Sequence, residues 1–165
     1  GIVTKVESSM IDLGIVEAPV TNQDLDVDIF RSDELVLITH PEHELAKRDS
    51  VKPSDILKLP FITREEGSGT KSVIFDYFLK HNIERNKLNV CMELGNSESI
   101  KGAVEAGIGV SILSKTTIEK ELELQRLAFI PLSPRLTRSF YFVKKRHKFK
   151  LKVTDELISY AKSCN

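Results

Sequence analysis

The sequence predicts an α/β protein, because short β-branched apolar runs alternate with amphipathic helical stretches along most of the chain. Three observations support this prediction: a strand-like run at 11–17, a helix-like stretch at 70–81, and a strand–helix–strand succession over 88–113. The 165 residues suffice for one ordinary domain or two small lobes. We therefore expect a hydrophobic core built around largely parallel sheets.

The first part of the chain is predicted to contain one helix, four strands and a short helical piece. Residues 1–9 resemble the interior of a helix, with Ile2, Val3 and Val6 at helical spacing. The run 11–17 is typical of a strand buried on both faces in a parallel sheet. Later strands are expected at 24–30, 33–40 and 61–64, with the helical piece around Asp55. The two adjacent strands break the alternation, as a connection between two lobes would.

The second part continues the alternation. Helices are expected at 70–81, 98–106, 116–124 and 152–162, and strands at 88–94, 109–113, 126–131 and 138–145. The first of these helices has one apolar stripe, formed by Val73, Ile74, Tyr77 and Phe78. The last helix is expected to bury Val153, Leu157, Ile158 and Ala161 on its inner face.

Composition indicates a soluble globular protein with no general attraction to polyanions. Hydrophobic residues make up 41% and charged residues 29% of the chain, and 24 basic residues balance 24 acidic ones. No apolar run is long enough to span a membrane and no leader segment is visible, so we expect a cytoplasmic location. The two cysteines favour one core thiol, Cys91, and one tail thiol, Cys164, in a reducing compartment.

The first candidate site is the stretch 67–70, Gly-Ser-Gly-Thr, directly ahead of a predicted helix. The first amide groups of a helix lack partners inside the helix, and glycine lets a ligand approach them closely. Ser68 and Thr70 add hydroxyls that either cap the helix or donate to an oxyanion. The alternative is a plain turn with an N-cap, and Glu65 and Glu66 would repel an anion unless they point away.

The second candidate site is the similar strand-to-helix turn at Asn96 and Ser97. Because carboxyl ends of parallel strands open on the same side, both turns should share one edge. Arg64, at the end of its strand, would pair with an acidic ligand or with a local acid such as Glu65. The stretch 107–109, Gly-Ile-Gly, ends a helix and precedes a strand, so it predicts a left-handed C-cap and close packing rather than a nucleotide site.

Catalysis and metal binding gain no support from the sequence. The four histidines are scattered, at His40, His43, His81 and His147, and no Ser/His/Asp or Cys/His motif is recognisable. We therefore expect no enzyme activity, no cofactor and no metal. The basic run HKFKLK at 147–152 is interpreted as a solvated surface.

Five segments in order resemble the effector-binding domain of LysR-type transcriptional regulators. They are IDLGIVEAPV (11–20), DELVLITHPEHELA (33–46), LPFITREEGSGT (59–70), ELGNSESIKGAVEAGIGVSILSK (93–115) and RSFYFVKKRH (138–147). The resemblance covers nearly the whole chain. The REEGSGT loop looks most like the branch that contains regulators of sulfur assimilation and of carbon fixation.

The resemblance implies a periplasmic-binding-protein-like fold of type II, with two Rossmann-like lobes joined by two crossover strands. Lobe I would hold 1–39 with 142–165, lobe II would hold 40–141, and DELVLITH and SFYFVKKR would be the crossovers. It also implies a DNA-binding winged helix-turn-helix and a first strand of lobe I that lie outside this sequence. A small effector, expected to be anionic, would occupy the cleft and couple to DNA binding in a homodimer or homotetramer.

By the same resemblance, nine residues would contact the effector. They are Glu17, Ala18, Pro19, Arg64, Ser68, Gly69, Thr70, Asn96 and Ser97. Glu66 stands where many relatives carry proline, which implies a looser loop. An apolar strip on the helix around Phe75, Phe78 and Leu79 would contribute to dimerisation or to the core, and the core is favoured for Phe78. The rival interpretation is a solute-binding protein of a transport system with the same fold.

Overall fold

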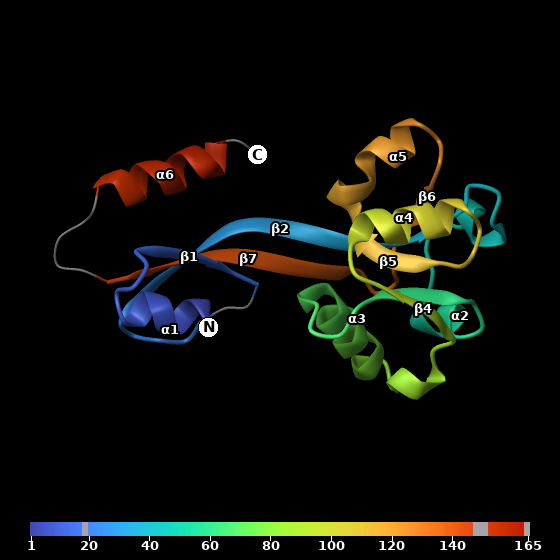
Figure 1. The fold of residues 1–165 in the computed structure, drawn as a ribbon, viewed down its shortest axis with the longest axis horizontal. Coiled ribbons are helices and arrows are strands. Elements are labelled where there is room, and N and C mark those ends of the chain that lie inside the picture. Colours follow the sequence, from blue (N-terminus) through green and yellow to red (C-terminus); the bar gives the residue numbers. More distant parts are fainter. Residues whose placement is uncertain (18–19, 147–151, 164–165) are drawn as a thin grey trace. The chain divides into compact units, whose positions relative to one another are not determined.

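The computed structural model describes residues 1–17, 20–146 and 152–163, and the chain divides into two compact units. Unit 1 comprises Gly1–Asp33 with Arg138–Asn165, and unit 2 comprises Glu34–Thr137. Two strands have residues in both units: β2 (Leu25–Thr39) and β7 (Leu136–Lys145) (Figure 1). These units are defined by packing, and the functional lobes expected at 1–39 with 142–165 and at 40–141 stay a prediction.

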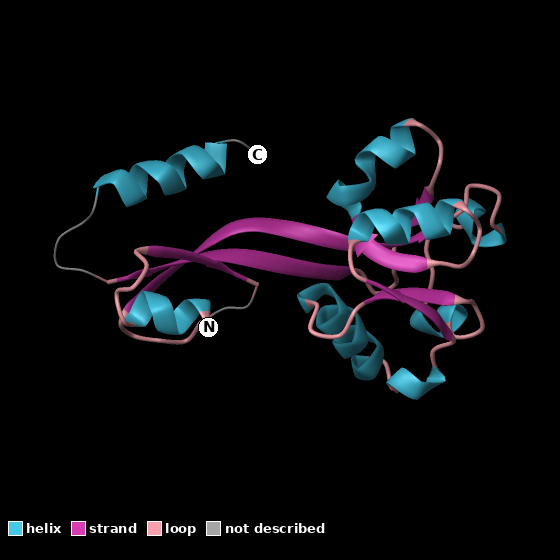
Figure 2. Cartoon of the chain, viewed as in Figure 1, coloured by secondary structure: helices cyan, strands magenta, loops and turns pink. Residues whose placement is uncertain are grey.

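Unit 2 is a three-layered α/β unit. Its elements are the 3-10 helix η1 (Glu44–Lys47), α2 (Pro53–Ile56), β3 (Phe61–Arg64), α3 (Gly69–Lys80), the 3-10 helix η2 (Arg85–Lys87), β4 (Val90–Leu94), α4 (Ser97–Glu105), β5 (Ser111–Ser114), the 3-10 helix η3 (Lys115–Ile118), α5 (Glu119–Glu123) and β6 (Ala128–Ile130). Helices α2 and α3 lie on one face of the strands and α4 lies on the other (Figure 2). The sequence thus predicted each of these α-helices and strands to within a few residues.

The strand pairing differs from the parallel sheets expected from the sequence. One sheet has the order β1-β7-β2-β5, with β6 also on β2; β2 runs antiparallel to β5 and β6, and β1 (Leu13–Val16) antiparallel to β7. Strands β3 and β4 form the parallel pair. The predicted strands 24–30 and 33–40 are one continuous strand, because no glycine or proline interrupts residues 24–40.

Two hydrophobic clusters hold α3 and α4 against the strands of unit 2. Ile74, Tyr77 and Phe78 of α3 pack with Phe61 in the first cluster, where the Phe61 and Phe78 rings meet edge to face with centroids 6.0 Å apart. The second cluster holds Ile100, Ala103 and Val104 of α4 with Ile62. Successive residues of β3 therefore point to opposite faces and anchor opposite helices.

Unit 1 has a much smaller buried cluster. It contains α1 (Ile2–Glu7), β1, the first part of β2, most of β7 and α6 (Lys152–Ser163), and its cluster consists of Val6, Leu25 and Val143. The predicted inner face of α6 is only partly buried, because Ile158 is buried whereas Val153 is 77% and Leu157 53% exposed. Helical periodicity predicts an apolar stripe, but only a packing partner buries it.

The prediction of a buried Cys91 is wrong. Along β4, Val90, Met92 and Leu94 are half-buried, whereas Cys91 and Glu93 are exposed. Val90, Met92 and Leu94 pack against the hydrophobic clusters of unit 2, whereas Cys91 and Glu93 lie on the other face of the strand. Cys164 and most of the basic run 147–152 lie outside the described residues. Within the described residues, no helix combines the length and apolar character that a membrane crossing requires.

Candidate functional site

Parallel pairing of β3 and β4 brings the two predicted loops to one edge of unit 2. Arg64 lies opposite Leu94 in the register, and the Glu65 amide donates to the Leu94 carbonyl at 3.1 Å. One Arg64 guanidinium nitrogen lies 3.4 Å from the Gly95 carbonyl oxygen. The loops 65–68 and 95–96 therefore lie side by side at the carboxyl ends of their strands, as the sequence predicted.

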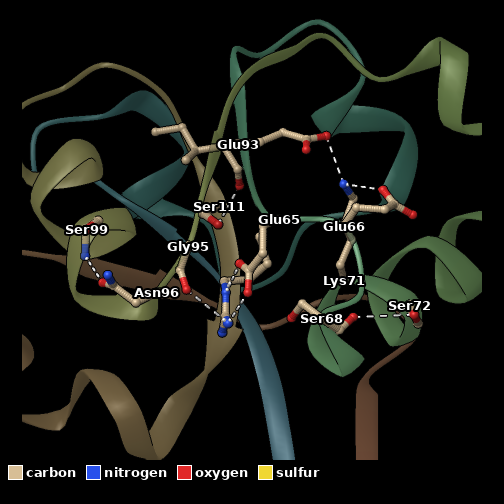
Figure 3. Close-up of polar contacts among 12 residues, drawn as sticks. Glu65, Glu66, Ser68, Lys71, Ser72, Glu93, Gly95, Asn96, Ser99 and Ser111 are labelled. Carbon is tan, nitrogen blue, oxygen red and sulfur yellow. Dashed lines mark hydrogen bonds and ion pairs between the residues drawn. The ribbon is translucent and has the colours of Figure 1, made fainter.

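Helix α3 begins without a capping hydrogen bond from its N-cap side chain. Gly67 has φ of +86°, which turns the chain sharply, and the Ser68 carbonyl then accepts the Ser72 amide at 3.1 Å. The Ser68 hydroxyl forms no cap bond although the residue is only 9% exposed. In Figure 3 this hydroxyl points toward the side on which Gly95 and Asn96 lie. The Ser68 hydroxyl, which can both donate and accept a hydrogen bond, therefore lies close to the start of α3 and does not cap it.

Helix α4 begins in the opposite way, with its cap in place. The Asn96 side-chain oxygen accepts the Ser99 amide at 2.8 Å, which is the standard N-cap bond (Figure 3). Glu98 places a carboxylate in the first turn, where it is stabilised by the helix dipole. The N-terminus of α4 is therefore capped by Asn96 and its dipole is partly compensated by Glu98, both at the start of the helix itself.

Arg64 pairs with Glu65, the local partner that the sequence offered as the alternative to a ligand. Two guanidinium nitrogens of Arg64 lie 2.8 Å from the two carboxylate oxygens of Glu65. This bidentate pair lowers the pKa of Glu65 to about 2 and raises the pKa of Arg64. The Arg64 charge is compensated by its neighbour, and its contact with Gly95 joins the two loops.

A second group of charges, which the sequence did not predict, fixes the other side of the loop. The ammonium of Lys71 is only 3% exposed and lies 2.8 Å from carboxylate oxygens of both Glu66 and Glu93 (Figure 3). Arg85 also reaches Glu66 at 2.8 Å and stacks on the Phe75 ring at 4.8 Å. Glu66 therefore closes the loop onto the helix, whereas the sequence had implied a looser loop there.

The pKa values of this group follow from its pairing. Hydrogen bonds from Arg85 and Lys71 lower the pKa of Glu66 to about 2. Burial by itself would lower the pKa of Lys71, but its bonds with Glu66 and Glu93 outweigh burial and leave the pKa raised. Glu93 is 22 positions from Lys71, so the one available indication was that Lys71 lies on the same helix face as Ile74, Tyr77 and Phe78.

The predicted site residues fall into two sets. Arg64, Ser68, Gly69, Thr70, Asn96 and Ser97 all lie at the β3–β4 carboxyl edge of unit 2. Glu17 belongs to unit 1, where its carboxylate lies 3.4 Å from the guanidinium of Arg138, which also binds Asp33 at 2.9 Å. Ala18 and Pro19 lie outside the described residues. The effector role of all nine residues stays a prediction.

The glycines at 107 and 109 are structural, as predicted. Gly107 has φ of +73°, its amide donates to Val104 and the Ile108 amide donates to Ala103, which is the Schellman pattern at the end of α4. A Cβ atom at Gly109 would lie 2.4 Å from the Pro60 carbonyl oxygen. Among the described residues, no cluster of three or more His, Cys, Asp or Glu side chains is suited to a metal.

Comparison with known proteins identifies the family. The LysR substrate binding domain family matches residues 1–163. The chain belongs to this family. As a LysR substrate binding domain, it is 35% identical over 157 residues to the uncharacterized HTH-type transcriptional regulator YeiE of Escherichia coli K12, covering 94% of the chain and 52% of that protein.

A second relative is the probable RuBisCO transcriptional regulator of Thalassiosira pseudonana, which is 32% identical over 160 residues and is matched over 93% of the chain and 52% of its own length. The LysR domain thus spans about half the length of these curated relatives. They are transcriptional regulators and not transport proteins, so the rival interpretation as a transport protein gains no support.

The solved structure of the Synechocystis CcmR regulatory domain in complex with 2-PG superposes on this LysR domain with a TM-score of 0.80. It is 28% identical, and the match covers 98% of this chain and 76% of that one. The match confirms the periplasmic-binding-protein-like fold expected from the sequence, with β2 and β7 as the strands that pass between the two units.

Proposed function

We propose that this LysR domain senses a small anionic effector at the paired helix starts of unit 2 and controls DNA binding by another segment of a transcription regulator. The observation that supports this most directly is that Ser68, a residue only 9% exposed at the start of α3, forms no capping bond with its hydroxyl. A helix N-terminus combines amide donors with the positive end of the dipole, which suits an oxyanion.

The neighbouring cations define how such an anion would be recognised. Arg64 is paired with Glu65, while Lys71 and Arg85 are paired with Glu66. An anion at the start of α3 would therefore be held mainly by amide and hydroxyl donors rather than by an uncompensated cation. We expect its affinity to depend only weakly on salt concentration, because no ion pair with the protein is formed.

The remaining contacts of the proposed site come from the family resemblance. Gly69, Thr70, Asn96 and Ser97 are proposed effector contacts at the same edge as Ser68, and Arg64 is proposed to connect the two loops. Glu17, Ala18 and Pro19 remain proposed contacts from the resemblance alone. In this proposal the domain has no catalytic activity, acts in the cytoplasm and works as a homodimer or homotetramer, because its relatives are transcriptional regulators.

Effector binding controls DNA binding only if the ligand prefers one conformation of the regulator. The free energy available for the switch equals the difference between the affinities of the two conformations for the ligand. A ligand held by groups on a single rigid unit would bind without switching anything. The proposal therefore requires that some effector contacts change when the regulator changes shape.

The test is a thermal-shift and calorimetric screen of the protein against 2-PG, sulfate and small carboxylates. Stabilisation grows with occupancy, by about 2.7 kcal/mol at a ligand concentration one hundred times Kd. We expect Ser68→Ala to weaken the best anion about tenfold or more, because a buried donor to a charged group is lost. Ser54→Ala, at an exposed position of α2 in the same unit, supplies the matched control and should leave the affinity unchanged. Binding of an uncharged compound but of no anion would remove the anionic effector from the proposal, and equal affinity in Ser68→Ala would remove the site.

A further inference from the structure

Unit 2 contains a cavity that is separate from the proposed effector site, and we name it the imidazole pocket. It measures about 280 Å³ and is lined by His40, Glu42, His43, Pro60, Gly107, Ile108, Gly109 and Val110. Pro60 directly precedes β3 and Val110 directly precedes β5, so the pocket lies at the amino ends of these strands. The loop 65–68 follows the carboxyl end of β3, at the opposite end of the same strand.

The two histidines of the imidazole pocket are oriented by their own backbone. The Glu42 amide donates to Nδ1 of His40, and the Leu45 amide donates to Nδ1 of His43, each at 3.2 Å. A nitrogen that accepts a hydrogen bond carries no proton, so in the neutral ring the proton is on Nε2. Both rings thus share one tautomer, in which Nε2–H is the donor that these backbone bonds leave unused.

This tautomer decides which ligand chemistry the pocket suits. A histidine that binds a metal through Nε2 normally donates its Nδ1–H to an acceptor, but here backbone donors occupy both Nδ1 positions. Metal binding would require both of these hydrogen bonds to break. Two Nε2–H donors are instead suited to an acceptor such as a carboxylate oxygen.

The remaining walls of the pocket are apolar. Pro60, Ile108 and Val110 line it, and Ile108 leaves 45% of its surface exposed. Glu42 is exposed and is the acidic residue among the lining residues. The pocket therefore offers hydrogen-bond donors beside hydrocarbon, as small-molecule sites do.

We propose that the imidazole pocket is a second ligand site of this domain and that it binds a small carboxylic acid with an apolar tail. The carboxylate accepts from Nε2–H of His40 and His43, and the tail covers the exposed side chains of Pro60 and Ile108. The site does not depend on the proposed effector site, because the two share no residue. Each can therefore fail while the other stands.

The test uses hexanoate as the probe, with nitrogen NMR of the imidazole rings of the protein. We expect both rings to show the Nε2–H tautomer before addition, and hexanoate to shift the Nε2 resonances of His40 and His43. Hexanoate should bind more tightly than acetate by about fourfold for each methylene group that enters the pocket. Hexanol, which has the same tail without the charge, should bind at least about tenfold more weakly than hexanoate.

Matched substitutions separate a ligand role from a structural one. His43→Gln keeps a donor near the position of Nε2 and should retain hexanoate affinity to within about threefold, whereas His43→Asn lacks that donor and should lose about tenfold. Glu42→Gln removes a like charge from an exposed position and should strengthen hexanoate binding without changing hexanol binding. This last variant keeps the proposal testable if substitution of His43 unfolds the protein.

Four results would overturn the proposal. The first is an Nδ1–H tautomer for both rings, and the second is equal binding of hexanoate and hexanol. The third is a loss of hexanoate binding in Ser68→Ala equal to that in His43→Asn, which would assign the acid to the β3–β4 edge. Saturable binding of Zn²⁺ to both rings at micromolar concentration would contradict the tautomer argument as well.

Discussion

Helices α3 and α4 both begin at the β3–β4 edge, but only α4 has an N-cap side chain that bonds one of its first amides. In α4, Asn96 caps the helix with its own side chain, whereas in α3 the hydroxyl of Ser68 forms no such bond. The loop before α3 is instead held by ion pairs, between Arg64 and Glu65 and between Glu66 and both Lys71 of α3 and Arg85 of η2. A side-chain cap satisfies one of the first amides of a helix, and an uncapped helix start leaves that amide available to a ligand.

The largest expected effect comes from removing the side chains that anchor the two helices. Phe78 of α3 and Ile100 of α4 are fully buried in the two clusters of unit 2. We expect Phe78→Ala to lower the free energy of unfolding by about 3–5 kcal/mol and Ile100→Ala by about 2–5 kcal/mol, measured by chemical denaturation. Leu79→Ala, next to Phe78 but 62% exposed, is the control and should change stability by less than about 0.5 kcal/mol. Similar values for Leu79→Ala and Phe78→Ala would contradict the packing described.

A smaller effect distinguishes the glycines of the two loops. Gly67 has φ of +86°, which an L-residue adopts at a cost of about 1–2 kcal/mol, although a Cβ atom there would meet nothing within 4 Å. Gly95 has an ordinary φ and is equally open. We therefore expect Gly67→Ala to destabilise the domain by about 1–2 kcal/mol and Gly95→Ala to be nearly neutral in thermal unfolding. A loss in both variants would show that space, rather than backbone conformation, limits these loops.

The caps themselves provide the sharpest comparison. Asn96→Ala removes a formed cap bond and should lower the free energy of unfolding by about 1 kcal/mol. Ser68→Ala removes no cap bond and should lower the free energy of unfolding by less than about 0.5 kcal/mol, while it weakens binding of the proposed effector. Equilibrium denaturation of the two variants in parallel measures the difference. If Ser68→Ala proved the more destabilising of the two, Ser68 would be a structural cap and the contrast between the helices would disappear.

The smallest expected effect is the acid sensitivity of the α3 loop. The pKa values of Glu65 and Glu66 are lowered to about 2 in the folded protein. A carboxylate whose pKa is lowered by folding stabilises the folded protein when the pH is above about 4.5, the ordinary pKa of the group. This contribution is lost as the pH falls toward about 2. Both side chains are exposed, so each contribution is small. Denaturation of Glu66→Gln should show a shallower fall in stability over this range than the parent protein.

The exposed Glu44 on η1 provides a control for this titration, because it forms no ion pair in the part of the chain that the structure describes. Glu44→Gln should leave the pH dependence unchanged. If Glu66→Gln behaves like Glu44→Gln, the pairs with Lys71 and Arg85 do not contribute to stability in solution.

Local pattern was sufficient for most helices and strands and for the edge that the two loops share. Parallel β3 and β4 follow from two apolar runs, each followed by a helix start, so Ser68 and Asn96 could be placed together before any coordinates. The pair of Arg64 with its neighbour Glu65 could be foreseen, but the pairing of Lys71 could not, because Lys71 meets Glu93 across 22 positions of the sequence. The same holds for His40 and His43, whose pocket is completed by residues 107–110.

By itself, the sequence determined the α/β class, the order of the elements, the glycine that ends α4 and the two loops that carry the proposed effector contacts. Only the tertiary structure decided the antiparallel pairing of β2, the exposure of Cys91, Val153 and Leu157, and the difference between the capped and uncapped helix starts. The physical reason is that periodicity and turn residues act over a few neighbouring positions. Strand partners, buried faces and ion pairs depend on which distant segments meet.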